Sequence, residues 1–424
     1  MIQTILITAA VTLLLVVFLR NLTTGEGKIT RKIEPLYGVE EPPFRRALGH
    51  LLGPPIVSGN RVDALYNGDQ IFPAMLEAIR GAQKTISFET YIYWSGEIGR
   101  KFTEALSERA RAGVRVHMLL DWLGSQRMDE ELLKRMEKDG VQIERYHPIR
   151  WYNLDRLNNR THRKLLIVDG RIGFTGGVGI ADDWLGHAQD KDHWRDNHFR
   201  VEGPVVAQMQ AAFMDNWLKT HSQVLHGDDY FPPLEDEEGP GTCDAQMFKS
   251  SSAEGSESAR LMFLLSIASA RRSLYIGNSY FVPDDLSVET LTDAARRGVH
   301  VEVMLPGRHI DTKITRQASR SRWGMLLEAG IEIWEFQPTM FHCKIMIVDE
   351  TWVSVGSTNF DNRSFRLNDE ANLNLIAPDF AKKQIEVFEE DKARCKKITL
   401  EQWRKRPFSE KLLEHAAGLL RSQV

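Results

Sequence analysis

Cysteine is scarce in this chain of 424 residues, with three copies at Cys243, Cys343 and Cys395. They form no Cys-x-x-Cys pair and their number is odd, which argues against a disulfide framework and favours a reduced compartment. No carboxylate stands at the spacing of a zinc motif, and no Gly-rich Walker loop is present. We therefore expect neither a metal site nor a P-loop nucleotide site.

The chain also lacks an excess of charge of one sign. Its 54 Lys and Arg residues nearly balance its 58 Asp and Glu residues, which gives a formal net charge of −4. A protein that binds nucleic acid tightly usually carries a basic footprint. Nucleic acid is therefore not an expected partner.

One long apolar run stands at the start of the chain, from Ile2 to Leu19. Its length is sufficient to cross a bilayer. A cleaved signal peptide would need Lys or Arg before the run and small residues after it, and neither is present. We expect a transmembrane anchor over 2–20. The positive residues that follow the apolar run predict a cytoplasmic body: Arg20, Lys28, Arg31 and Lys32.

A pattern of His-x-Lys-x4-Asp occurs twice. At ordinary residue frequencies, one match by chance is expected in only about one chain in thirty of this length. Each copy is followed by matching small residues, Gly176-Gly177 in the first and Gly356-Ser357 in the second. Two solvated strand ends do not explain this repetition. The copies consist of His162, Lys164 and Asp169, and of His342, Lys344 and Asp349.

Each copy is typical of a polar strand start that leads into a buried apolar run. Because side chains alternate along a strand, His162 and Lys164 share one face, as do His342 and Lys344. A histidine beside a fixed positive charge provides a nucleophile or an acid for phosphodiester chemistry. Cys343 points to the other face and is interpreted as a core residue.

Further repeats flank the two motifs. Residues 110–116 match residues 295–301, and both segments predict a helix, a glycine C-cap and a strand. Alternating helices and short apolar strands predict an α/β sandwich in each half. Composition then gives the domain boundaries. We expect a Pro- and Gly-rich juxtamembrane connector over 21–60, a first domain over 61–225, an acidic Pro-, Gly- and Ser-rich linker over 226–258, and a second domain over 259–424.

The double motif resembles the signature of the phospholipase D superfamily at every defining residue, and the resemblance extends from about Ser58 to about Glu401. It implies two similar α/β halves around a pseudo-twofold axis, with both histidines in one site. It also implies a two-step reaction through a phosphohistidine, without a metal or another cofactor. The resemblance suggests His162 as the nucleophile and His342 as the acid and base, although the near-symmetry of the copies leaves the order open.

A nucleophilic imidazole needs a carboxylate to orient its other nitrogen. Asp196 and Glu370 stand where family members carry this acid. The resemblance further implies that Asn359 and Ser357 contact phosphate. Gly179 stands where the first copy usually has Asn, which removes one expected donor. Asp169 and Asp349 each end a buried run, which indicates structural hydrogen-bond acceptors rather than proton carriers.

The first half carries an insertion before its motif. Pro148 precedes His162 by fourteen residues, whereas Pro338 precedes His342 by four. The inserted segment, 149–160, contains three Arg residues, Trp151 and Tyr152. These residue types suit an anionic lipid at a membrane interface. An ordinary surface loop with one packed Trp explains them equally well.

Within the superfamily, the chain is most similar to the bacterial cardiolipin synthases. The similarity rests on the apolar N-terminal segment, Trp194-Arg195-Asp196-Asn197-His198 and Asp361-Asn362-Arg363-Ser364-Phe365. It implies a phosphatidyltransferase of the bacterial inner membrane that converts two phosphatidylglycerol molecules to cardiolipin and glycerol. Three alternatives stay open: a phospholipase D that uses water, an anchored nuclease, and a membrane scaffold without activity.

Overall fold

The computed structural model describes residues 2–22, 29–148, 158–234, 239–251 and 257–419. The first half, with the segments before it, contains six helices, a 3₁₀ turn and eight strands among the described residues. Its helices are α1 (Ile2–Leu22), α2 (Pro42–Leu52), α3 (Asn67–Gly81), α4 (Glu97–Arg111), α5 (Glu130–Lys138) and α6 (Val205–His221), with the 3₁₀ turn at Asp182–Trp184. Its strands are β1 (Val57–Tyr66), β2 (Thr85–Thr90), β3 (Arg115–Asp121), β4 (Gln142–Tyr146), β5 (Arg160–Thr161), β6 (Leu165–Val168), β7 (Ile172–Gly176) and β8 (Asn197–Glu202).

The second half repeats most of this order and adds one strand and two helices at its end. Its helices are α7 (Ser258–Ala268), α8 (Asp285–Arg296), α9 (Lys313–Arg320), α10 (Trp323–Glu328), α11 (Asn362–Arg366), α12 (Pro378–Lys392), α13 (Leu400–Arg404) and α14 (Phe408–Leu419). Its strands are β9 (Cys243–Ser250), β10 (Ser273–Asn278), β11 (His300–Pro306), β12 (Glu332–Phe336), β13 (Lys344–Val348), β14 (Trp352–Gly356), β15 (Asn368–Ile376) and β16 (Cys395–Ile398).

The repeated helix, glycine and strand that the sequence predicts are present in both halves. Helix α4 ends before Gly113, whose φ of 91° is followed by β3. Helix α8 ends before Gly298, whose φ of 95° is followed by β11. Glycine adopts this left-handed conformation without steric cost, so it ends each helix and turns the chain into the next strand.

The two predicted α/β halves are present, and one sheet runs through both of them. Its order is β16-β12-β11-β10-β13-β14-β15-β9-β1-β8-β7-β6-β2-β3-β4, and β5 pairs with β15 to the side. The order of the first half mirrors that of the second around the antiparallel pair of β1 and β9. This arrangement is a pseudo-twofold relation whose axis passes between these two strands.

Two predicted connecting segments contain structure. The expected linker 226–258 holds β9, which pairs with β15 along seven residues and is the counterpart of β1. Its neighbours in sequence are rich in Pro, Gly and Ser, which hid this short strand. The expected connector 21–60 holds α2 and the start of β1, and Phe44 and Leu48 of α2 are buried in the core of the second half.

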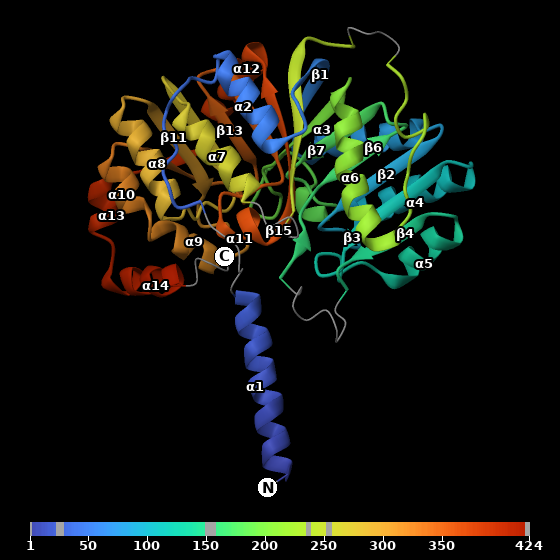
Figure 1. Cartoon of the computed structure of the whole chain (residues 1–424), viewed down its shortest axis with the longest axis horizontal. Coiled ribbons are helices and arrows are strands. Elements are labelled where there is room, and N and C mark those ends of the chain that lie inside the picture. Colours follow the sequence, from blue (N-terminus) through green and yellow to red (C-terminus); the bar gives the residue numbers. More distant parts are fainter. Residues whose placement is uncertain (1, 23–28, 149–157, 235–238, 252–256, 420–424) are drawn as a thin grey trace.

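Helices cover both faces of the sheet (Figure 1), and three large hydrophobic cores are buried between these layers. Helices α3 and α4 cover one face of the first half, and α7 and α8 cover the corresponding face of the second. Helices α6 and α12 contribute to a third core that both halves share. This shared core fixes the two halves to each other, and therefore fixes the ends of their strands.

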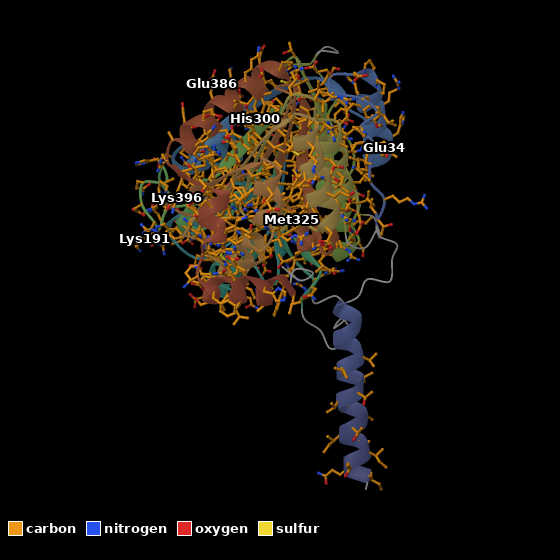
Figure 2. All side chains as sticks on the ribbon, turned by 90° about the vertical axis from the view of Figure 1, so that its left-hand side faces the viewer. Glu34, Lys191, His300, Met325, Glu386 and Lys396 are labelled. Atoms are coloured by element: carbon orange, nitrogen blue, oxygen red, sulfur yellow. The ribbon has the colours of Figure 1, made fainter. Side chains whose placement is uncertain are left out.

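Helix α1 projects away from the body, and the side chains drawn on it touch no other element (Figures 1 and 2). Its described apolar side chains are exposed, for example Leu6 at 64% and Leu13 at 65%. Within the described part of the chain, no helix combines the length and the apolar character needed to cross a membrane.

Candidate active site

Both motifs open into one cavity of about 400 Å³ between the two halves. His162 and Lys164 line it from the first half, and His342 lines it from the second. The remaining lining residues are Tyr91, Ile92, Arg160, Trp184, Trp194, Tyr280, Asp311, Thr312, Ile314, Thr315, Asn359, Asp361, Arg363 and Asn368. The structure thus brings together side chains that stand far apart in the sequence.

Backbone hydrogen bonds across the axis hold the two histidines in place. The backbone N–H of His162 donates to the carbonyl of Asp369 in the second half, with an N···O distance of 2.8 Å. The backbone N–H of His342 donates to the carbonyl of Arg195 in the first half, at 2.7 Å. His162 directly follows β5 and lies three residues before β6, and His342 lies two residues before β13, so each histidine is held next to a strand end.

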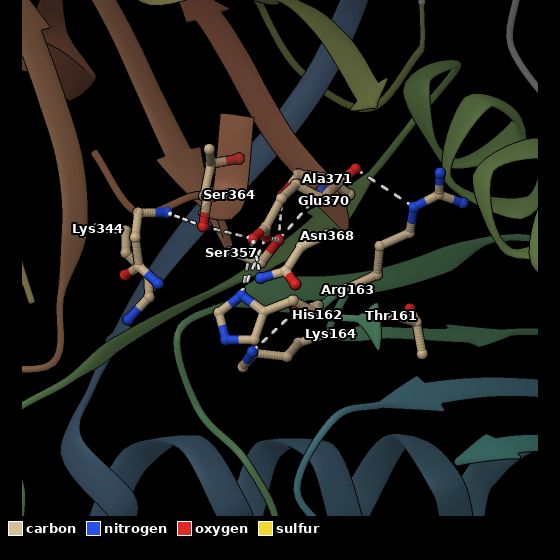
Figure 3. A network of polar contacts seen from close by, with 12 residues as sticks. Thr161, His162, Arg163, Lys164, Lys344, Ser357, Ser364, Asn368, Glu370 and Ala371 are labelled. Atoms are coloured by element: carbon tan, nitrogen blue, oxygen red, sulfur yellow. Dashed lines mark hydrogen bonds and ion pairs between the residues drawn. The ribbon is translucent and has the colours of Figure 1, made fainter. Parts of the chain in front are cut away.

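Each imidazole is held by a carboxylate from the opposite half. Nδ1 of His162 lies 3.0 Å from both carboxylate oxygens of Glu370 (Figure 3). Nδ1 of His342 lies 2.7 Å from Oδ2 of Asp196. In each case the Nδ1–H group donates to the carboxylate, which leaves Nε2 as the acceptor nitrogen of the ring. In His342, Nζ of Lys344 lies 3.1 Å from this Nε2. Each acid stands downstream of the histidine of its own half in the sequence, but it contacts the histidine of the other half.

The two carboxylates are buried and have different supporting donors. Glu370 accepts hydrogen bonds from the hydroxyls of Ser357, at 2.5 Å, and Ser364, at 2.7 Å. Asp196 accepts from the indole N–H of Trp184, at 2.9 Å. Ser357, expected to contact phosphate, therefore lies beneath Glu370 and does not line the cavity. Its hydroxyl keeps the carboxylate ionised and correctly oriented.

Ionic pairing keeps both acids charged despite their burial. Burial raises the pKa of Glu370, but the opposite effect of His162 and Lys164 is larger. The pKa of Glu370 therefore lies below its ordinary value. Burial also raises the pKa of Asp196, and His342 and Lys344 reverse that effect. Both sites therefore present a carboxylate, rather than a carboxylic acid, to the imidazole.

Burial lowers the pKa of both histidines. For His162 this desolvation outweighs the attraction of Glu370 and brings the pKa to about 4. Desolvation and then the charge of Lys344 lower the pKa of His342. In the absence of an anion, both rings are therefore neutral at neutral pH, as a nucleophilic imidazole requires.

The two lysines form a concentrated positive region. Burial, followed by repulsion from Lys344, lowers the pKa of Lys164 to about 7. Burial lowers the pKa of Lys344 to about 8, with nearby carboxylates acting in the opposite direction. Nζ of Lys344 donates to the hydroxyl of Ser279, at 2.6 Å, and this hydroxyl donates to Asn359, at 3.0 Å. An anion between the lysines raises both pKa values and stabilises their charged forms.

The two aspartates of the signature lie outside the cavity. Asp169 accepts three backbone N–H groups, from Gln83, Lys84 and Thr85, at 2.7 to 2.8 Å. Asp349 makes the equivalent bonds to the backbone N–H groups of residues 271–273. They fix the turns at the far ends of the motif strands, so their side chains do not reach the imidazoles.

Gly179 leaves no room for the asparagine that the second half carries as Asn359. A Cβ atom at Gly179 would lie 2.8 Å from Cβ of Ile92 and 3.3 Å from the ring of Trp184. Both neighbours line the cavity. The first-half wall is therefore apolar and aromatic where the second-half wall carries the Ser279 and Asn359 network.

Most of the insertion lies outside the described residues, including Trp151 and Tyr152. Its last residue, Arg160, is described and lines the cavity. The guanidinium of Arg160 lies 3.8 Å from the carboxylate of Asp121 and donates to the carbonyl of His147. One of the three arginines of the insertion therefore belongs to the site.

Sequence reasoning missed the residues that support the acids. Trp184 stands as far beyond His162 as Ser364 stands beyond His342, and each donates to the acid of its own half. Extending the internal repeat past the glycines pairs these two positions. Their different residue types conceal the shared role. Among the described residues, no group of three or more His, Cys, Asp and Glu side chains is arranged to hold a metal ion.

The chain resembles known proteins along most of its length. The family model described as "Cardiolipin synthase, PLD-like domain" matches residues 75–217 and 264–392. A cardiolipin synthase of Geobacillus kaustophilus is 34% identical over 368 residues, which cover 86% of this chain and 73% of that protein. Cardiolipin synthase 1 of Bacillus cereus is 35% identical over 381 residues, with coverages of 87% and 73%.

A solved structure shares the architecture. The crystal structure of phosphatidylserine synthase from Haemophilus influenzae superposes with a TM-score of 0.69 at 16% sequence identity. The match covers 90% of this chain and 100% of that one. At this identity the similarity concerns the fold alone.

Proposed function

This chain belongs to the phospholipase D-like family of cardiolipin synthases, and we propose from this premise that it transfers a phosphatidyl group between two phosphatidylglycerol molecules. The products are cardiolipin and glycerol. The observation that carries the proposal is the pair of histidines in one cavity, each held by a carboxylate from the opposite half. Such a pair supplies the nucleophile and the acid that phosphodiester exchange requires.

In the first step, Nε2 of His162 attacks the phosphorus of one phosphatidylglycerol. A bond forms between nitrogen and phosphorus, and the bond from phosphorus to the headgroup oxygen breaks. His342 donates a proton to this oxygen, so glycerol leaves as a neutral alcohol. The Glu370 carboxylate stabilises the positive charge that develops on the His162 ring, because it lies 3.0 Å from Nδ1.

Lys164 and Lys344 neutralise the phosphate in this step, and Asn359 donates to one of its oxygens. The anionic substrate also raises the pKa of His342 and favours the protonated form that acts as the acid. Because the lysines are buried and already positioned, they need little reorganisation as charge builds up on phosphorus.

In the second step, the terminal hydroxyl of a second phosphatidylglycerol attacks the phosphohistidine. His342, now neutral, takes the hydroxyl proton as a base. The new bond joins oxygen to phosphorus, and His162 leaves with its lone pair restored. The cycle returns both histidines to their starting states, so protons and bonds balance without a cofactor.

The choice of a lipid hydroxyl over water follows from the walls of the cavity. Tyr91 lies edge-on to His162, with ring centroids 5.3 Å apart. Trp184 and Trp194 each lie 5.4 Å from the ring of His342. These aromatic walls and Gly179 restrict the water beside the phosphohistidine and provide an apolar surface for a lipid.

The apolar segment at 2–19 provides the membrane anchor in this proposal. This segment contains no charged residue, and the sequence stays apolar through Leu19. Ile29, seven residues beyond α1, is fixed to the body because its backbone N–H donates to Glu257 at 2.7 Å. An extended chain advances by at most about 3.6 Å per residue, so the body lies within roughly 25 Å of the end of α1.

Glu257 also pairs with Arg366 of α11, the helix whose Arg363 lines the cavity. The anchor therefore holds the cavity close to the surface where phosphatidylglycerol is concentrated. The basic residues after the apolar segment support a cytoplasmic position of the body. Protease added outside intact spheroplasts should leave the body uncut, and its digestion there would refute this topology.

Lipid extraction after incubation with phosphatidylglycerol vesicles tests the activity. We expect cardiolipin as the main product of the purified full-length protein at low glycerol, with an equal amount of glycerol released. The His162→Ala and His342→Ala variants should each lose nearly all turnover. Phosphatidic acid as the main product would instead identify a phospholipase D.

A further inference from the structure

Helix α14 exposes its apolar face to solvent, whereas most surface helices turn this face toward the core. Phe408, Leu412 and Leu419 have exposed fractions of 79%, 59% and 75%. Their spacing of four and then seven residues places them on one stripe of the helix. In a soluble protein such a stripe normally packs against the core.

The opposite side of α14 is charged and faces the protein. Glu414 is 1% exposed and accepts from Arg320 of α9, at 2.9 Å, and from Arg406, at 2.6 Å. Arg320 also donates to Glu410, at 3.0 Å. These ion pairs, together with the buried Ala417, fix the orientation of the helix. The exposed apolar stripe is therefore a stable feature of the fold.

Helix α14 lies on the side of the body from which α1 projects (Figure 1). Helix α14 packs against α9, and Ile314 of α9 is 43% exposed and lines the cavity that contains both histidines. Helix α14 is therefore in contact with a helix that lines the cavity, and Ile314 adds an exposed apolar side chain to that lining. Lys313 on α9 and Lys411 on α14 are also exposed and add positive charge beside the stripe.

We propose that α14 lies in the surface of the bilayer, with Phe408, Leu412 and Leu419 among the lipid chains. The helix thereby seats the mouth of the cavity on the membrane, and the exposed lysines meet anionic headgroups. Interfacial helices combine an apolar face with basic flanks in this way. The inference rests on the proposed function, since it takes the substrate to be a membrane lipid. A second protein bound at this stripe would obstruct the mouth through which that lipid enters.

Quenching by brominated lipids tests the position of α14 without measuring activity. In full-length protein with Cys243→Ser and Cys395→Ser, a fluorescent label is attached through Leu412→Cys or Leu419→Cys. The matched control is Leu51→Cys on α2, because Leu51 is also 59% exposed but α2 lies on the opposite side of the body. Vesicles of phosphatidylglycerol with brominated chains should quench the labels on α14 and leave the label on α2 bright.

Activity provides the second measurement. The double variant Leu412→Glu/Leu419→Glu should lose about tenfold or more of its rate on vesicles, because charge replaces apolar contact with the bilayer. It should keep its rate on phosphatidylglycerol dispersed in detergent micelles. The control Leu51→Glu should change neither rate.

The outcomes separate the two proposals. If the unmodified protein transfers no lipid in vesicles or micelles, the proposed function fails, and quenching still reports the position of α14. If transfer occurs but the α14 labels are quenched no more than the control, the docking proposal is overturned. The labels on α14 could instead be shielded from solvent in the absence of lipid, and this shielding could disappear when the protein is diluted. That result would identify a second copy of the chain as the occupant of the stripe and would also overturn the docking proposal.

Discussion

Replacing Glu370 with glutamine should impair His162, although the two residues belong to different halves. Both carboxylate oxygens lie 3.0 Å from Nδ1 of the imidazole. At this distance, and at an effective dielectric constant of about 20, a carboxylate and an imidazolium attract by about 5 kcal/mol. Glutamine keeps the shape and one acceptor but removes the charge.

Part of this attraction is retained by the glutamine dipole. We therefore expect a loss of about 3 to 4 kcal/mol in the transition state, which corresponds to a fall of roughly 10²- to 10³-fold in kcat. The buried Glu302, which pairs with Lys392 outside the cavity, provides a control. Its replacement by glutamine should leave kcat unchanged. Thermal melts of both variants establish that the protein is folded.

The exchanged pairing itself is tested with an activated substrate. A phosphatidyl ester of p-nitrophenol releases a leaving group that needs no proton, so the burst of p-nitrophenol reports the first step without the acid. This substrate should rescue the first step in each of two single variants, His342→Ala and Asp196→Asn. It should not rescue His162→Ala or Glu370→Gln. If Glu370→Gln instead behaves as His342→Ala does, the pairing across the axis has no role in catalysis.

Three further predictions concern charge, pH and stability. Turnover should continue in excess EDTA because Lys164 and Lys344 supply the positive charge; loss of turnover that Mg²⁺ restores would contradict this. The alkaline limb of kcat/KM should fall as pH rises through about 7 to 8, because these lysines lose their protons there, whereas His162 is already neutral above pH 5. A flat profile to pH 10 would be inconsistent with charged lysines in binding. Asp169→Ala should lower the free energy of unfolding by about 2 to 4 kcal/mol, measured by urea denaturation, since three backbone N–H groups lose their acceptor; Asp169→Asn should lose less, and an unchanged midpoint for both would refute the structural role.

The sequence predicted the repeated elements and the grouping of the motif side chains because both depend on local patterns. Gly113 and Gly298, for example, end their helices because glycine readily adopts a positive φ, and this property depends on the residue alone. The exchange of Asp196 and Glu370 depends instead on which strand ends meet across the axis, and distance along the chain carries no such information. The position of Ser357 depends on the pairing of β14 with β15, which brings its hydroxyl against Glu370 within the same half.

Strand β9 was missed for a different reason. It has eight residues, and the Pro, Gly and Ser around it dominate the local composition. Its apolar side chains, among them Ala245 and Met247, are buried by β15 and α6, which are distant in sequence. A short strand that gains its stability from such partners gives only a weak local signal.

The exchange of acids between halves has a consequence for how activity depends on the amount of protein. A separated half would carry a histidine without its acid and an acid without its histidine, so two independent halves would have to collide before either could react. Activity would then vary with the product of their two concentrations. In one chain the halves meet at an effective concentration in the millimolar range, set by the segment that joins them. Residues 226–258 contribute no described side chain to the cavity. Because they join the two halves, the rate is proportional to the number of chains, however dilute the protein is in its membrane.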